Sequence, residues 1–167
     1  MGAHREARQQ FIEDAGDLLE DHGLPHMAGR VMGALLVCVP PEMSMDELAE
    51  MLQASKGSIS TATQLMLRFG FIEKISRPGH RKHYYRIRRD VWSHIIEQDT
   101  AHLVTHTALV DAGLALMEGE PEPTKERLLE MRLFTEFIEE EMPALLVRWE
   151  ARREAFHAAR AATLQRS

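Results

Sequence analysis

The residues best suited to chemistry lie in one stretch, Ser55–Arg89, which is rich in cations, hydroxyls and amides. It holds nine lysines and arginines and a single acid, Glu73, so its formal balance is +8. The whole chain stands at −6, which leaves −14 for the remainder. Groups that can neutralise phosphates or hydrogen-bond to base edges are thus concentrated in a short part of an acidic protein. This local asymmetry is typical of a nucleic-acid-binding surface.

The pattern around this stretch predicts a helix, a short turn, a second helix and a β-hairpin. Ser44 and Glu47 have the spacing of a capping box at the start of the first helix. The second helix should end at Phe69, where Gly70 can take the left-handed conformation. Two β-rich runs, "FIEKIS" and "KHYYRIR", flank the turn "RPGH". This order of elements is that of a winged helix-turn-helix.

The second helix has one apolar and one polar face. Ile59, Ala62, Met66 and Phe69 are spaced by three, four and three residues and should pack on the core. The opposite face suits base edges in the major groove, and the helix start and hairpin tip suit phosphates. A basic hairpin that is merely solvated is the alternative. The residues predicted to bind double-stranded DNA are Ser55, Lys56, Ser58, Ser60, Thr61, Gln64, Arg68, Arg77, His80, Arg81, Lys82 and Arg86.

The flanking segments are predicted to be helical, so the fold class is mainly α with a small β-hairpin. Residues 1–22 should form a dimerisation helix, with its apolar face made of Phe11, Ala15, Leu18 and Leu19. Residues 23–89 should form the DNA-binding domain, and they begin with an apolar helix at 27–38. Residues 90–167 should form the long C-terminal dimerisation helices.

Dimerisation is expected because these long helices exceed what one small core requires. The first should run over 90–118 and the second from Thr124 to about 160, with Pro143 kinking or interrupting it. A homodimer would also reach two half-sites on DNA. Two uncharged stripes could form the seam, one at Ile96, Thr100, Leu103, Thr107, Val110, Leu114 and Met117, the other at Leu128, Met131, Phe134, Ile138, Met142, Leu145 and Trp149.

The run "SMDELAEMLQASKGSISTATQLMLRFGFIEKISRPGHRKHYYRI" resembles the winged-helix core of the MarR superfamily, and particularly its GbsR-like branch. The likeness extends upstream through "GLPHMAGRVMGALLVC" and downstream through the long helices. It implies a homodimeric transcriptional regulator, usually a repressor, whose hold on DNA a small effector loosens. The chain is similar to bacterial repressors of efflux-pump operons. We expect a hydrophobic effector between the dimer helices and the DNA-binding core, with a pocket at Val31, Met32, Leu35 and Leu36.

Two other functions stay open at this point. His102 and His106 stand four residues apart on a predicted helix and share a face with Asp99, so a metal-sensing regulator of the zinc type is one alternative. A non-specific DNA-organising protein is the other, although such a protein is expected to be basic overall.

Several classes are not supported by the sequence. It has no Gly-rich phosphate loop, nucleophile elbow or strong metal-ligand spacing, so we expect no enzyme, no cofactor and no resident metal. The longest apolar run, near 31–39, is too short to span a bilayer, and a cytoplasmic protein without membrane contact is expected. The single cysteine, Cys38, has apolar neighbours and is predicted to be a buried structural thiol.

Overall fold

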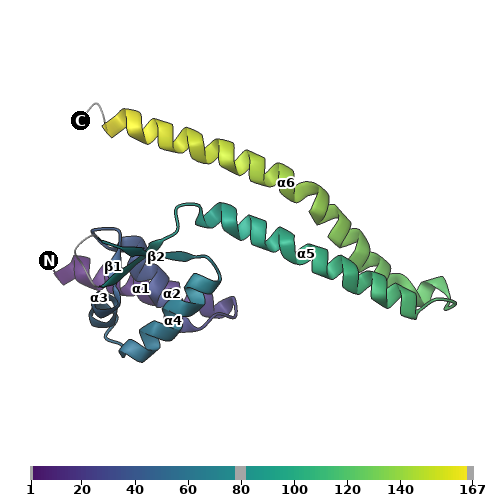
Figure 1. Ribbon diagram of the computed structural model, residues 1–167, viewed down its shortest axis with the longest axis horizontal. Coiled ribbons are helices and arrows are strands. Elements are labelled where there is room, and N and C mark those ends of the chain that lie inside the picture. The colour runs from purple at the N-terminus through teal and green to yellow at the C-terminus, as the bar shows by residue number, and fades with distance from the viewer. Residues whose placement is uncertain (1, 78–81, 165–167) are drawn as a thin grey trace. The chain divides into compact units, whose positions relative to one another are not determined.

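The computed structural model describes residues 2–77 and 82–164, with the side chains at 2 and 99–105 outside that description. The chain divides into two compact units, Met1–Val91 and Trp92–Ser167. Mainly helical elements with one small sheet make up the fold, as the sequence predicts. The first unit holds α1–α4 and the three strands, and the second consists of a pair of long helices (Figure 1).

The first unit contains the predicted winged helix-turn-helix, preceded by two helices that pack on each other. The hairpin of β2 and β3 is called the wing below. In chain order, the elements are α1 (Gly2–Asp21), α2 (His26–Val37), β1 (Met43–Ser44), α3 (Met45–Met51), α4 (Lys56–Arg68), β2 (Ile72–Ser76) and β3 (His83–Ile87).

The local signals at the helix ends are confirmed. The Ser44 side chain caps α3 by accepting a hydrogen bond from the backbone N–H of Glu47, and the Glu47 carboxylate accepts one from the Ser44 N–H at 2.6 Å. Gly70 follows α4 with a φ of 69°, in the left-handed region. The turn between α3 and α4 contains Gln53, also at positive φ. These caps fix the lengths of both helices and the sharp turn between them.

The sheet has one strand that the sequence did not indicate. Its order is β1-β3-β2, and both pairings are antiparallel. β1 is only two residues long and pairs Met43 with Tyr85. Two residues are too few to show an alternating pattern, so only the neighbouring β3 reveals β1 as a strand. β1 continues directly into the Ser44 cap of α3, and it thereby ties this helix to the wing.

The core of the first unit lies between α1, α2, α3, α4 and the sheet, and its centre contains Ile12, Val31, Leu48, Ile59 and Met66, each fully buried. α1 reaches this core because glycines of α2 let the two helices approach closely. A Cβ at Gly29 would lie 2.2 Å from the Ala15 carbonyl oxygen. α1 therefore belongs to the same compact unit as the helix-turn-helix.

Two predicted apolar faces are partly wrong. In α1, Ile12 and not Phe11 enters the core, and both Phe11 and Leu18 are exposed. The close crossing at Gly29 turns α1 so that Ile12 and Ala15 meet α2. In the helix-turn-helix, Phe69 is 43 % exposed because it is the C-cap residue of α4, where the helical periodicity ends.

The second unit is an antiparallel hairpin of α5 (Val91–Leu116) and α6 (Glu122–Leu164), which run side by side in Figure 1. Trp149 donates its indole N–H to the Ser93 hydroxyl at 3.1 Å, and Thr107 donates to the Glu139 carboxylate at 3.0 Å. On the same face of α5, Val110 is fully buried. Thr107 and Val110 of the predicted α5 seam therefore face α6 of their own chain.

Pro143 lies inside α6, which continues as one helix to Leu164. Of the two outcomes expected, a kink or an interruption, the interruption does not occur, and Figure 1 shows that α6 bends along its course. A proline removes one backbone hydrogen bond and tilts the turn before it, which a long helix can absorb as a bend. In the described ranges, no helix combines the length and the apolarity needed to cross a lipid bilayer.

Candidate nucleic-acid interface

The polar face of α4 is free of the core, as predicted. Ile59, Ala62, Thr63 and Met66 are buried, and they hold the helix by one side. The opposite side is polar and at least partly accessible, and its most exposed members are Lys56, Thr61, Gln64 and Arg68. Two of these have local contacts: Thr61 donates to the Gly57 carbonyl at 3.1 Å, and the Gln64 amide donates to the Ser60 hydroxyl at 3.3 Å. Both bonds lie at the surface, where a base edge can replace them.

The start of α4 is capped by the chain itself. Ser55 is the N-cap residue, and its hydroxyl accepts a hydrogen bond from the Ser58 backbone N–H at 3.2 Å. That N–H is therefore occupied, whereas the hydroxyls of Ser55 and Ser58 can still donate to a phosphate. The cap fixes the direction of the first turn, which carries Lys56.

The wing supplies the second group of predicted contacts. His80 and Arg81 lie outside the described residues. Arg77 directly follows β2, and its guanidinium stacks on the Tyr84 ring, 4.6 Å from the centroid, and bonds to the Glu42 carboxylate. Arg86 on β3 pairs with Glu73 on β2 at 2.6 Å, directly across the hairpin. These contacts orient the two arginines and also partly neutralise them.

One carboxylate joins the start of α4 to the wing. Asp46, in the first turn of α3, accepts from the Lys56 ammonium at 2.5 Å and from the Lys82 ammonium at 2.6 Å, using a different oxygen for each. The two hydrogen bonds, with that from Lys56 the stronger cause, lower the pKa of Asp46 to about 2. The same contact raises the pKa of Lys82. The first residue of α4 and the base of the wing are thus neighbours.

The sequence missed these acids because they stand outside the basic stretch. Glu42 and Asp46 flank β1, and the pairing of β1 with β3 places them beside the wing. The ion pair of Glu42 with Arg77 connects residues 35 positions apart, and that of Asp46 with Lys82 connects residues 36 positions apart. The +8 balance of the stretch therefore overstates the charge that DNA would meet. Among the residues that the structure describes, Arg68, Lys74 and Arg89 have no ion pair.

The predicted effector residues differ in how far they are exposed to solvent. Val31 and Leu35 are in the core, Met32 is half-buried, and Leu36 is 45 % exposed. None of the four lines the cavity of about 850 Å³ that lies in the same unit.

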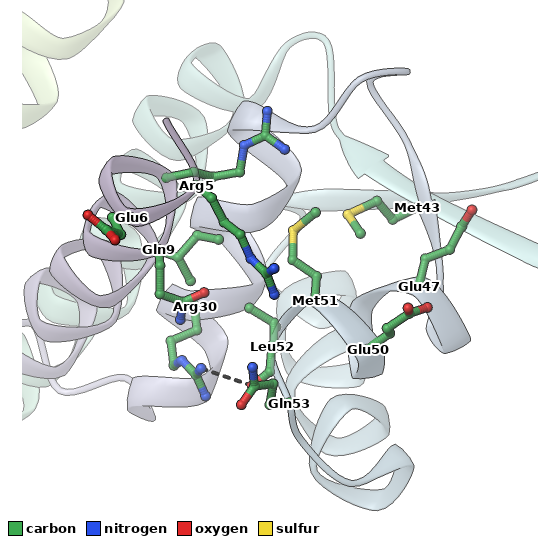
Figure 2. A pocket seen from close by; sticks show the side chains of 12 residues that line it. Arg5, Glu6, Gln9, Arg30, Met43, Glu47, Glu50, Met51, Leu52 and Gln53 are labelled. Carbon is green, nitrogen blue, oxygen red and sulfur yellow. Dashed lines mark hydrogen bonds between the residues drawn. The ribbon is translucent and has the colours of Figure 1, made fainter. Parts of the chain in front are cut away.

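That cavity lies between α1 and α3, and its lining is amphipathic (Figure 2). Arg30 crosses its lower part and donates to the Leu52 carbonyl at 2.9 Å while pairing with Glu13. Within the described part of the chain, Arg5 and Arg8 have no ion pair. The lining residues are Arg5, Glu6, Arg8, Gln9, Ile12, Arg30, Met43, Glu47, Glu50, Met51, Leu52 and Gln53.

The other candidate groups are accounted for as follows. Cys38 is buried and donates to the Leu35 carbonyl at 3.4 Å, and burial raises the pKa of its thiol. The His102 side chain lies outside the described part, and His106 is exposed. Potential ligand atoms of Asp17, Glu20 and His26 lie within 4.8 Å of one another. Asp17 and Glu20 are exposed, and the Asp17 carboxylate accepts a hydrogen bond from His26 Nε2 at 3.1 Å.

Comparisons with known proteins agree with this architecture. The model of the family "MmpR5-like MarR family transcriptional regulator" matches residues 90–152, which include most of the helical hairpin. The HTH-type transcriptional regulator MmpR5 of Mycobacterium tuberculosis is 34 % identical over 91 % of this chain and 92 % of that protein. The HTH-type transcriptional repressor GbsR of Bacillus subtilis is 28 % identical over 54 % of this chain and 49 % of its own length. A crystal structure of a transcriptional regulator, 33 % identical, superposes with a TM-score of 0.77 over 87 % of this chain and 99 % of that one.

Proposed function

Because the chain belongs to the MarR family of HTH-type transcriptional regulators, as an MmpR5-like member, we propose that it is a sequence-specific dimeric repressor that a small ligand releases from DNA. The protein is a DNA-binding regulator of transcription and not an enzyme. Repression is supported by the name of the GbsR relative, and specificity by the polar face of α4.

One observation gives the main support for the proposed DNA-binding surface. The start of α4 and the base of the wing meet at Asp46, so a helix able to enter a major groove stands beside a ribbon able to reach the flanking backbone. In this arrangement, Gln64, Thr61 and Arg68 read bases, and the lysines and the wing arginines contact phosphates.

The first test separates base reading from charge. The operator is obtained by selecting genomic DNA that the protein binds. Gln64→Ala should then weaken operator binding by about 1–3 kcal/mol and leave random duplex binding unchanged, because an amide reads a base edge and carries no charge. Both affinities are measured by fluorescence anisotropy at one salt concentration.

The control for this test is Arg81→Ala, at a position that the sequence predicts to contact phosphate. It should weaken both duplexes alike and flatten the salt slope by about one unit. Equal losses on operator and random DNA for Gln64→Ala would show that α4 does not read sequence. A protein that binds both duplexes equally well from the start would instead be the non-specific DNA organiser.

The homodimer is proposed to form through the outward face of the helical hairpin. The described part of the uncharged α5 seam is already occupied by α6, as Val110 and Thr107 show. Large apolar side chains nevertheless remain exposed on α6. Leu129, Leu133 and Phe137 stand four residues apart on one face, and Phe134 lies next to them. Such a row is costly in water, and a second copy of the chain would cover it by two-fold symmetry.

The ligand is proposed to occupy the cavity between α1 and α3. Ile12, Met43, Met51 and Leu52 give it an apolar part, and the cavity borders α3, which positions α4. Arg5 and Arg8 line the same cavity without an ion pair in the described ranges, which favours an anionic head group. The proposed effector is therefore an amphipathic anion.

Two surfactants with the same tail test this ligand class. Dodecanoate should release operator DNA at a lower concentration than dodecylammonium, since only the carboxylate can pair with the arginines. Arg8→Gln should reduce this preference several-fold, whereas Arg152→Gln, an exposed arginine on α6, should retain it. Release is followed by anisotropy of labelled DNA. Equal potency of the two surfactants on the wild type would contradict an anionic effector.

A further inference from the structure

Four cations of the proposed DNA-binding surface are already paired with carboxylates in the structure. Lys56 and Lys82 share Asp46, Arg77 is held by Glu42, and Arg86 by Glu73. The contact at Asp46 differs from the other two ion pairs, because Asp46 lies on α3 and connects Lys56, at the start of α4, with Lys82, at the base of the wing. One carboxylate stands between α4 and the wing, with one oxygen for each ammonium group.

The geometry around Asp46 resembles that of a bound phosphate. Two ammonium groups converge on adjacent oxygens of one anion, at 2.5 and 2.6 Å, which are distances typical of strong charge-assisted hydrogen bonds. All three side chains are open to solvent, with 71 % exposure for Lys56, 62 % for Lys82 and 42 % for Asp46. A DNA phosphate can therefore approach the same ammonium groups without any movement of the core.

The Asp46 carboxylate is negatively charged at neutral pH. The pKa of Asp46 is lowered to about 2, so its carboxylate stays ionised at neutral and mildly acidic pH. Asp46 is not needed for the α3 cap, which Ser44 and Glu47 form between themselves. Its position in the first turn of α3 is favoured by the helix dipole, and its ion pairs with the two lysines are contacts outside that helix.

We infer that Asp46 is an internal competitor of DNA phosphate. It binds Lys56 and Lys82 and thereby lowers the affinity of the protein for every duplex. The inference rests on the proposed DNA-binding function. Binding of a phosphate must displace the carboxylate or share the lysines with it, so the cluster offers a net charge of +1 in place of +2. The cost is the same for all sequences, because phosphates carry no sequence information.

The decisive variant is Asp46→Asn, which keeps the shape of the side chain and removes its charge. It should bind random and operator duplexes about three- to tenfold more tightly at low salt, as expected for the release of two exposed ion pairs. The plot of log K against log salt should become steeper by about one unit. The ratio of operator to random affinity should stay as in the wild type.

Asp21→Asn is the matched control, because it removes one negative charge from the same compact unit, at a residue that lines neither the cavity nor the proposed DNA-binding surface. Asp21 is exposed and has no ion pair within the described residues, so the loss of its charge should change affinity less than twofold. A second measurement uses Lys82→Ala, which should weaken binding more in the Asp46→Asn background than in the wild type. This coupling shows whether Asp46 acts through the lysine.

The outcomes separate this inference from the function on which it rests. Wild-type protein that binds no duplex at all overturns the proposed function itself. Wild-type protein that binds DNA, with Asp46→Asn equal to it or weaker, overturns only the competitor role. An equal gain from Asp21→Asn also overturns it, because the effect would then come from general charge. Circular dichroism establishes that each variant is folded.

Discussion

Gly29→Ala should lower the free energy of unfolding of the first unit by about 3 kcal/mol. The added Cβ would lie 2.2 Å from the Ala15 carbonyl oxygen and 2.7 Å from the Gly16 Cα. Both are backbone atoms, so no side chain can rotate away and α1 must separate from α2. The separation would also loosen Ile12, the fully buried residue by which α1 joins the core. Urea unfolding at a fixed protein concentration measures the change.

Gly57→Ala provides the control for this prediction. The site is also helical, but the nearest atom to its added Cβ is the Ser55 hydroxyl oxygen at 3.9 Å. Stability there should be unchanged or should rise by up to about 1 kcal/mol, because alanine favours the helix. If Gly29→Ala unfolds at the wild-type urea concentration, the close crossing of α1 and α2 is wrong.

Replacing two exposed apolar residues of α6 should have the largest effect on function. Leu133 and Phe137 are 67 % and 55 % exposed and stand four residues apart on one face. The double variant Leu133→Glu/Phe137→Glu should leave the chain folded, since neither side chain is in a core, and should prevent dimerisation. Operator affinity should fall by roughly 10²–10⁴-fold, because a monomer loses the second half-site and its high effective concentration.

Light scattering after size exclusion measures the mass, and anisotropy measures the affinity. Leu164→Glu is the control, because this residue is also exposed, at 71 %, but stands at the end of α6. It should keep the dimer mass and the operator affinity. A double variant that remains dimeric would place the interface elsewhere, for example at the exposed Phe11 and Leu18 of α1.

The sequence predicts best what local residues determine. The capping box of Ser44 and Glu47, the left-handed Gly70 and the pairing of the two hairpin strands each depend on nearby residues, and all three are confirmed. The predicted Pro-Gly turn itself lies outside the described residues. The apolar face of α4 follows from periodicity until the helix ends at Phe69. The same periodicity identifies the opposite, polar face of α4 as the side that stays free of the core.

Features that depend on distant partners could not be predicted. An apolar stripe such as that of Val110 requires a partner, but its spacing does not say whether the partner is α6 or another subunit. The rotation of α1 follows from the close approach at Gly29, which needs both helices in place. Likewise, the pairing of Asp46 with Lys82 spans 36 positions and depends on β1, which is too short to have a signal.

Met43 has two contacts that bear on how a ligand would act. Its side chain lines the cavity, and its backbone pairs with Tyr85 in the inner strand of the wing. The next residues form the cap of α3, so a single short segment is shared by the cavity wall, the sheet and the helix-turn-helix. A ligand that displaces Met43 would therefore shift the wing and the helix-turn-helix together. Both are joined to Met43 through backbone contacts only a few bonds away.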